Sequence, residues 1–178
     1  MLLIKGFMFC IALAIATADY TCFPKSEGEC LQAWANEHST KDFCDNQIAM
    51  AKCKVKAAKD CKTGFEDDAT VAQWMLAEAC TEGTSSYKAI RRNNSCGIKV
   101  LNPNSGCYEN YEKDLKKFDR SPDFLEIASI TCRHLDDITN CLYKKAERCD
   151  FEAKLAIRSI VRSDKKIYDQ VCAAFPSF

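Results

Sequence analysis

Glycine and proline are scarce in this sequence, which has only 6 glycines and 4 prolines. Both residues interrupt helices, and proline is tolerated only in the first helical turn. Long stretches are instead rich in Ala, Lys, Glu and Leu, which favour helices. No segment alternates polar and apolar residues with the period of two that a half-buried strand requires. The sequence therefore predicts an all-α protein.

Long apolar runs are also missing after the first residues of the chain. A membrane-spanning helix needs roughly 20 apolar residues, so no membrane span is predicted. The opening segment MLLIKGFMFCIALAIATA has one lysine, a short apolar stretch and a small-x-small ending. This pattern is typical of a secretory signal peptide, residues 1–18, with cleavage after Ala18. We expect a secreted, extracellular protein.

Neither sign of charge is in excess, because the chain has 25 basic and 25 acidic residues. Nucleic acids and anionic membranes are bound by basic surfaces, so neither is an expected partner. One acceptor sequence for N-glycosylation, Asn93-Asn94-Ser95, lies in a polar stretch. It predicts an exposed and glycosylated Asn93.

Cysteine is abundant, with 13 residues, of which Cys10 lies in the predicted signal peptide. The remaining twelve are an even number, which in an exported chain predicts a complete set of disulfides. Zinc sites favour cysteines about two to four residues apart, a spacing absent here, so no metal or other cofactor is expected. The predicted disulfide cysteines are Cys22, Cys30, Cys44, Cys53, Cys61, Cys80, Cys96, Cys107, Cys132, Cys141, Cys149 and Cys172.

The spacing of these cysteines repeats. The gaps read C-x8-C-x7-C-x18-C from Cys44 to Cys80 and C-x8-C-x7-C-x22-C from Cys132 to Cys172. Two further cysteines precede each block. The fold prediction is therefore a disulfide-rich helical bundle made of two tandem helical repeats with six cysteines each. We place them at residues 19–88, the first half, and 89–178, the second half.

Local signals place the helices of the first half. The patterns at 26–29 and 39–42 resemble capping boxes, which predict helices near 27–37 and 40–62. A further helix is expected over 67–80, with the acidic residues 66–68 in its first turn, where they are favourable. A short helix is expected around 87–91.

The second half has clearer periodicity. Ser121-Pro122 predicts a helix start, since proline is favourable in the first turn. Asp150 is the expected cap of a last helix. Apolar residues recur at helical spacing after both caps. They are Ala128, Thr131, Leu135, Ile138 and Leu142 after the first cap, and Ile157, Ile160, Ile167 and Val171 after the second.

Helical spacing also limits the disulfides. On one helix, Cys132 and Cys141 point to nearly opposite sides, at about 100° per residue. Cys141 and Cys149 are about two turns apart, farther than the roughly 7 Å a bridge allows. Cys132, Cys141 and Cys149 must therefore each bond to a cysteine of a different neighbouring segment. The same is expected for the trio of cysteines with equal spacing in the first half. Six cysteines still allow about 15 pairings.

Catalytic motifs are hard to find. The two histidines are His38, at a predicted helix end, and His134, in CRHLDD. A secreted calcium-dependent phospholipase would use His134 with Asp136 or Asp137. Its motif needs adjacent cysteines and a glycine-rich calcium loop, and both are absent, so His134 is interpreted as an exposed helix residue. Hydrolase, phosphate-loop and EF-hand motifs are also absent, and no catalytic residue is predicted.

Aromatic residues allow two interpretations. Trp34, Trp74 and the aromatics near Phe175 could line a ligand cavity between helices. The simpler interpretation is that they belong to the core.

The block formed by Cys132, Leu135, Cys141, Cys149 and Cys172 resembles the C-terminal part of the insect haemolymph glycoproteins of the twenty-seven-kilodalton type. It is also similar to cysteine-rich helical domains in secreted proteins of nematodes and arachnids. The resemblance covers about forty residues by spacing. It implies an extracellular helical protein and no site residues.

These observations predict a secreted, non-enzymatic extracellular binding or body-fluid protein. Its expected partner is an extracellular protein or a small apolar ligand. The alternative is a venom or salivary effector that acts on a receptor or channel, because small disulfide scaffolds serve this role. A divergent secreted hydrolase is the third hypothesis.

Overall fold

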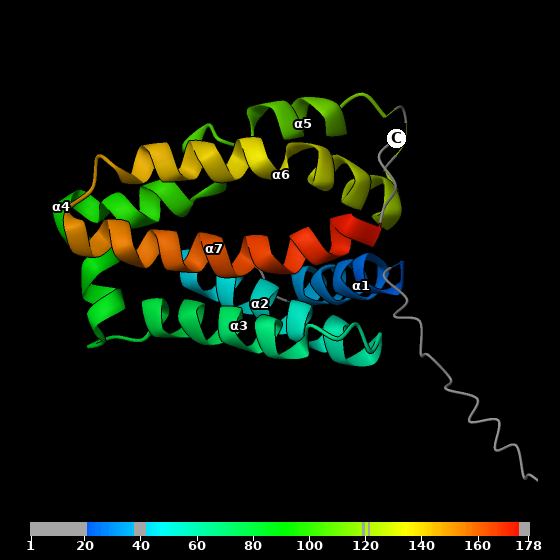
Figure 1. Cartoon of the computed structure of the whole chain (residues 1–178), viewed down its shortest axis with the longest axis horizontal. Coiled ribbons are helices and arrows are strands. Elements are labelled where there is room, and N and C mark those ends of the chain that lie inside the picture. The colour runs from blue at the N-terminus through cyan, green and yellow to red at the C-terminus, as the bar shows by residue number, and fades with distance from the viewer. Residues whose placement is uncertain (1–20, 38–41, 119, 121, 175–178) are drawn as a thin grey trace, which may run out of the picture.

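The computed structural model describes residues 21–37, 42–118, 120 and 122–174, and it shows a bundle of helices (Figure 1). Seven α-helices and one short 3-10 helix lie in these ranges, which contain no strand. The predicted all-α, disulfide-rich fold is thereby confirmed. The predicted signal peptide, His38 and Phe175 lie outside the described residues. The elements are α1 Cys22–Glu37, α2 Phe43–Asp60, α3 Glu66–Cys80, α4 Ser85–Leu101, η1 Pro103–Ser105, α5 Glu109–Leu115, α6 Phe124–Ala146 and α7 Phe151–Ala174.

Helix α7 runs through the middle of the bundle as seen in Figure 1. Helices α1, α2 and α3 lie on one side of it in this view, and α5 and α6 lie on the other, while the kinked α4 passes from the first side to the second at the left end of the bundle. Helix α7 contacts α3, α4 and α6 directly. The last helix of the second half therefore packs against helices of both halves.

The core shows the same arrangement. Ile157 and Ile160 of α7 belong to one cluster of buried apolar side chains, together with residues of α3, α4 and α6. Ile167 and Val171 belong to another cluster, whose remaining members all come from α1, α2, α3 and the α2–α3 connection. All four of these predicted apolar positions are buried, as their helical spacing indicated. Each of the two clusters thus contains residues of both halves of the sequence.

Six disulfides tie the helices together. Each joins two cysteines of the same half, and in each half the first cysteine pairs with the fifth, the second with the fourth and the third with the sixth. The bridges are Cys22–Cys61, Cys30–Cys53 and Cys44–Cys80 in the first half, and Cys96–Cys149, Cys107–Cys141 and Cys132–Cys172 in the second.

The expectation that every bridge of a trio reaches a different segment is confirmed for the second half only. There the bridges run from α6 and its C-terminal end to α7, to α4 and to Cys107 in the connection between η1 and α5. In the first half, Cys53 and Cys61 both bond to α1, so the expectation is wrong there. The reason is that α1 lies alongside α2, and Cys22 and Cys30 have the same eight-residue spacing as their partners.

Three helix starts differ from the predicted ones. Helix α1 begins at Cys22, so the predicted capping box at 26–29 lies inside the helix. Helix α6 begins at Phe124 rather than at Pro122, because the Asp123 side chain accepts hydrogen bonds from the amides of its first turn in a capping box with Glu126.

The third is the start of α2, which was expected near residue 40. Helix α2 begins at Phe43, because Asp42, the last residue of the predicted capping box, is itself the cap and accepts hydrogen bonds from the amides of Cys44 and Asp45 at 2.8 and 3.1 Å. The starts of α3 and α7 agree with the sequence. Asp150 caps α7 through the amide of Ala153 at 2.8 Å. Helix α3 matches the expected span, with three acidic residues in its first turn.

Helix α4 is longer than the short helix expected at 87–91, and it contains a sharp kink. Residues 93–95 have left-handed backbone angles, with φ between 48° and 60°. Beyond the kink the backbone returns so closely that a Cβ at Gly97 would lie 2.7 Å from the Cα of Ile90. Asn93 is exposed in this kink, and its Nδ2 donates to Asp150 at 2.9 Å. Its glycosylation stays a prediction.

Candidate functional site

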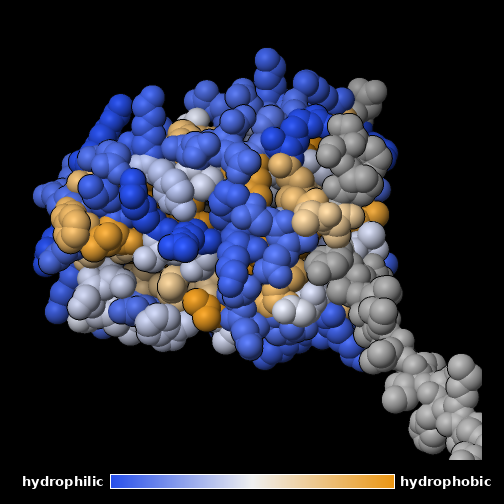
Figure 2. Space-filling model, viewed as in Figure 1, coloured by the Kyte–Doolittle hydropathy of each residue, from blue (hydrophilic) through white to orange (hydrophobic). Residues whose placement is uncertain are grey.

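A surface groove of about 490 Å³ lies between α3, α4 and α7. Pockets of this size are large enough for a small organic ligand. Figure 2 shows hydrophobic side chains gathered on this face over the N-terminal part of α7, at the left of the view. The lining residues that matter here are Trp74, Met75, Glu78, Lys88, Arg92, Glu152, Leu155, Ala156 and Ile160.

Trp74 dominates the rim of the groove. Its side chain is 62% exposed, and Leu155 on the facing helix is 48% exposed. The residues of α3 that are buried instead are Ala69, Ala72, Leu76 and Ala79. The interpretation of Trp74 as a core residue is therefore wrong, and its alternative placement in a cavity between helices is confirmed.

Four charged side chains line the same groove. Arg92 of α4 and Glu152 of α7 form an ion pair with each other across it. Glu78 of α3 and Lys88 of α4 form no ion pair within the described ranges. Because Glu78 follows Trp74 by four residues, the two side chains lie on the same face of α3.

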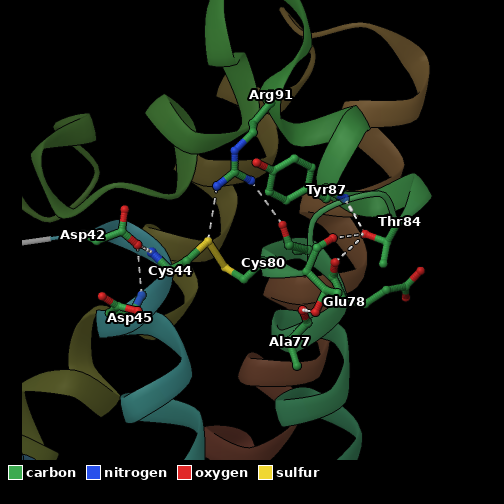
Figure 3. The surroundings of a disulfide bond; sticks show 11 residues. Asp42, Cys44, Asp45, Ala77, Glu78, Cys80, Thr84, Tyr87 and Arg91 are labelled. Carbon is green, nitrogen blue, oxygen red and sulfur yellow. Dashed lines mark hydrogen bonds between the residues drawn. A yellow bond between two sulfur atoms is a disulfide. The ribbon is translucent and has the colours of Figure 1, made fainter.

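Arg91 of α4 holds the corner between α3 and α4, beside the disulfide that joins α2 to α3 (Figure 3). The Arg91 guanidinium lies over the ring of Tyr87, with its carbon 3.7 Å from the ring centre. It donates to the carbonyl oxygen of Ala79 and contacts the sulfur of Cys44 in the Cys44–Cys80 disulfide, each at 3.4 Å. One wall of the groove is thereby cross-linked to its neighbour.

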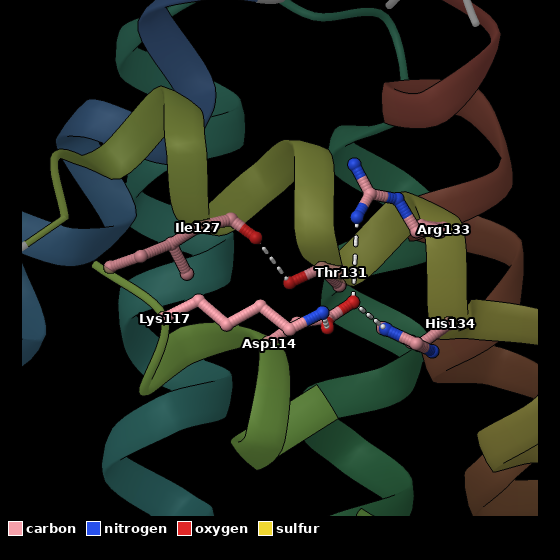
Figure 4. A network of polar contacts seen from close by, with 6 residues as sticks. All are labelled: Asp114, Lys117, Ile127, Thr131, Arg133 and His134. Atoms are coloured by element: carbon pink, nitrogen blue, oxygen red, sulfur yellow. Dashed lines mark hydrogen bonds and ion pairs between the residues drawn. The ribbon is translucent and has the colours of Figure 1, made fainter. Parts of the chain in front are cut away.

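His134 does not occupy the exposed position expected from the sequence. Its side chain is only 13% exposed, and its Nε2 lies 2.8 Å from a carboxylate oxygen of Asp114 on α5 (Figure 4). The correction arises because α5 packs against α6 and covers this turn. Lys117 and Arg133 also face Asp114, at 2.6 and 3.4 Å.

This cluster keeps the Asp114 carboxylate ionised. The hydrogen bond from Lys117, followed by that from His134, holds the pKa of Asp114 well below its ordinary value. A second cavity of about 610 Å³ adjoins it and is lined by Asp114, Lys117, Phe118 and the start of α6.

A buried charged cluster at the junction of α1, α2 and α7 is not predictable from any pattern in the sequence. Lys54 is 4% exposed and Glu27 is 7% exposed. The Lys54 ammonium donates to Asp164 and lies 4.9 Å from the ring centre of Tyr168. The Tyr168 hydroxyl in turn lies 3.0 and 3.1 Å from the two carboxylate oxygens of Glu27.

Burial dominates the titration of this cluster. It raises the pKa of Glu27, against the opposing effects of the Lys54 charge and the Tyr168 hydroxyl. Burial also acts to lower the pKa of Lys54, but the charges of Asp164 and Glu27 together outweigh it, so that the pKa is raised. Burial and the neighbouring carboxylates raise the pKa of Tyr168 well above its ordinary value. The cluster is a structural connection between the two halves.

No family model, curated protein or solved structure matches this chain. The resemblance to the haemolymph glycoproteins, based on cysteine spacing, stays a prediction. Within the described part of the chain, no helix is long and apolar enough to cross a membrane. In those same ranges, no three His, Cys, Asp or Glu side chains gather in a way that would hold a metal ion.

Proposed function

We propose that the chain is a secreted, non-enzymatic extracellular binding protein, and that the groove between α3, α4 and α7 holds its ligand. The observation that carries this proposal is the exposed Trp74 beside an apolar floor of Met75, Leu155 and Ile160. A tryptophan exposed to this degree at the edge of a pocket offers a large apolar surface for a ligand to cover.

The scaffold supports the same proposal. Six disulfides are typical of proteins that work in oxidising, extracellular surroundings. They hold the helices around the groove in fixed positions, so that little ordering cost is added on binding. The resemblance to extracellular helical proteins points in the same direction.

A fluorescent apolar probe, N-phenyl-1-naphthylamine, tests the proposal. We expect one site on the mature protein, with affinity lowered at least tenfold by Trp74→Ala and by Leu155→Ala. Leu125→Ala is the matched control, since Leu125 is 42% exposed but lines the second cavity. Unchanged binding in the two groove variants, or loss only in the Leu125 variant, would overturn the proposal.

A second candidate function is that of a venom or salivary effector acting on a receptor. It is favoured by Phe151, which is 69% exposed one helical turn from Leu155 and extends the apolar surface beyond the groove. Exposed apolar surface of this kind is typical of protein contacts. Expression confined to a venom or salivary gland would favour this candidate over a general body-fluid protein.

A further inference from the structure

We propose that the ligand of the groove is a zwitterionic amphiphile, a molecule that joins an ammonium and a phosphate group to one acyl chain. This inference rests on the proposed function and adds the chemical class of the ligand. It is carried by the arrangement of opposite charges around the apolar floor.

The floor of the groove accounts for the acyl chain. Met75, Leu155, Ala156 and Ile160 present aliphatic carbon and sulfur atoms from α3 and α7. A flexible chain of methylene groups gains binding free energy for each group that is buried. Because the groove is open along one side, only part of a long chain would be covered.

The α3 wall accounts for the ammonium. Trp74 and Glu78 are four residues apart, so an aromatic face and a carboxylate stand side by side on the helix. Tryptophan is the best aromatic partner for a cation, and a carboxylate beside it adds a direct charge attraction. A quaternary or primary ammonium is the group that both side chains bind.

The α4 wall accounts for the phosphate. Lys88 lies in the first part of α4, and within the described residues its ammonium forms no ion pair. Arg92, one turn further, is already paired with Glu152. The groove therefore presents one charge of each sign without an ion-pair partner in the described residues, on two different helices. A ligand with a single net charge would leave one of them unpaired.

Four probes with the same twelve-carbon chain separate the head groups: dodecylphosphocholine, dodecyltrimethylammonium, dodecyl sulfate and dodecyl maltoside. Each is titrated below its micelle concentration. Trp34→Phe leaves Trp74 as the single tryptophan of the chain, whose emission reports occupation of the groove. We expect dodecylphosphocholine to bind about tenfold more tightly than the other three.

Two variants test which side chain binds the ammonium and which binds the phosphate of the ligand. Glu78→Gln should weaken both trimethylammonium probes at least fivefold and leave dodecyl sulfate unchanged or tighter. Lys88→Met should weaken dodecylphosphocholine and dodecyl sulfate and spare dodecyltrimethylammonium. Glu82→Gln and Lys52→Met are the matched controls, because both residues are exposed and neither lines the groove.

The outcomes separate the two proposals. If no probe binds, the proposed function and this inference both fail. If all four bind equally and the Glu78 and Lys88 variants behave as wild type, the groove is a ligand site but the zwitterion inference is overturned. Phosphocholine without a chain and phosphatidylcholine vesicles complete the series. Tight binding of either, without preference for the single-chain probe, would contradict a ligand that uses both head group and chain.

Discussion

Replacement of Lys54 by methionine tests the buried charged cluster directly. The change keeps the length of the side chain and removes the ammonium that faces Asp164 and Glu27. Removing one partner of a buried ion pair costs about 3–5 kcal/mol. Asp164 is 37% exposed and keeps part of its hydration, so we expect a loss of about 3 kcal/mol at pH 7.

The loss should depend on pH, because Glu27 has a raised pKa in the folded protein. A carboxyl group with a raised folded pKa binds its proton more tightly in the folded state than in the unfolded state. Stability is therefore greatest below the ordinary pKa and falls as the pH rises towards the folded value. Without the opposing charge of Lys54, the pKa of Glu27 rises further. The variant should consequently lose more stability at pH 7 than at pH 4, by about 1.4 kcal/mol for each further unit of pKa.

Guanidinium unfolding with the disulfides intact measures the effect. With a slope of about 3 kcal/mol/M, a loss of 3 kcal/mol lowers the midpoint by roughly 1 M at pH 7. The added change Glu27→Gln should restore part of this loss at pH 7. Lys56→Met is the control, because Lys56 is 62% exposed and its ion pair with Asp60 contributes at most about 1 kcal/mol. Equal midpoint shifts for Lys54→Met at pH 4 and pH 7 would refute the role assigned to Glu27.

Three other predictions follow from local geometry. Gly97→Ala should lower the free energy of unfolding by about 2 kcal/mol, because the added Cβ would lie 2.7 Å from the Cα of Ile90; an unchanged denaturation midpoint would contradict this close approach. Hydrogen bonds from a lysine and a histidine lower the pKa of Asp114 in the folded protein. This shift stabilises the fold at a pH above the ordinary aspartate pKa of about 3.9, and the stabilisation is lost as the pH falls below that pKa. The difference in melting temperature between wild type and Asp114→Asn should therefore shrink in acid, and a constant difference would count against the cluster. The Cys107–Cys141 bridge has a sequence separation of 34, so replacing both cysteines by alanine should lower the free energy of unfolding by roughly 4 kcal/mol. Circular dichroism should still show a single unfolding transition, because the halves share buried clusters. Loss of only half the helical signal would argue for independent halves.

The helices themselves were largely predictable, because periodic apolar residues and capping side chains act locally. The last helix is the clearest case, since Asp150 caps it and its isoleucines at 157, 160 and 167 are all buried. The start of α1 is not predicted, because the pattern at 26–29 that resembles a capping box lies inside the helix, where Glu27 accepts a hydrogen bond from Tyr168 across the bundle. A local pattern carries no information about such a distant partner.

The candidate site was predicted only in part, for a reason that lies in α3. Its sequence shows Trp74 and Met75 on one face and alanines such as Ala72 on another. Hydrophobicity alone favours burial of the larger side chains, whereas the structure buries the alanines and leaves Trp74 at the surface. Close packing against α2 and α7 decides this choice, and that packing depends on which helices meet.

The two halves raise the question of how one arrangement of bridges came to occur twice. Six cysteines allow about 15 pairings, so two unrelated halves would share one pairing order in roughly one case in 15. The same order therefore supports our proposal of tandem repeats at 19–88 and 89–178. In that proposal α2 corresponds to α6 and α3 to α7, since the disulfide between the third and sixth cysteines joins α2 to α3 in the first half and α6 to α7 in the second.

The correspondence is not complete, because α7 is longer than α3 and buries Ile167 and Val171 against the first half. Because its last helix packs into the core of the first repeat, the second repeat is not an independent unit in this proposal. The groove between α3, α4 and α7 is formed where the two repeats meet.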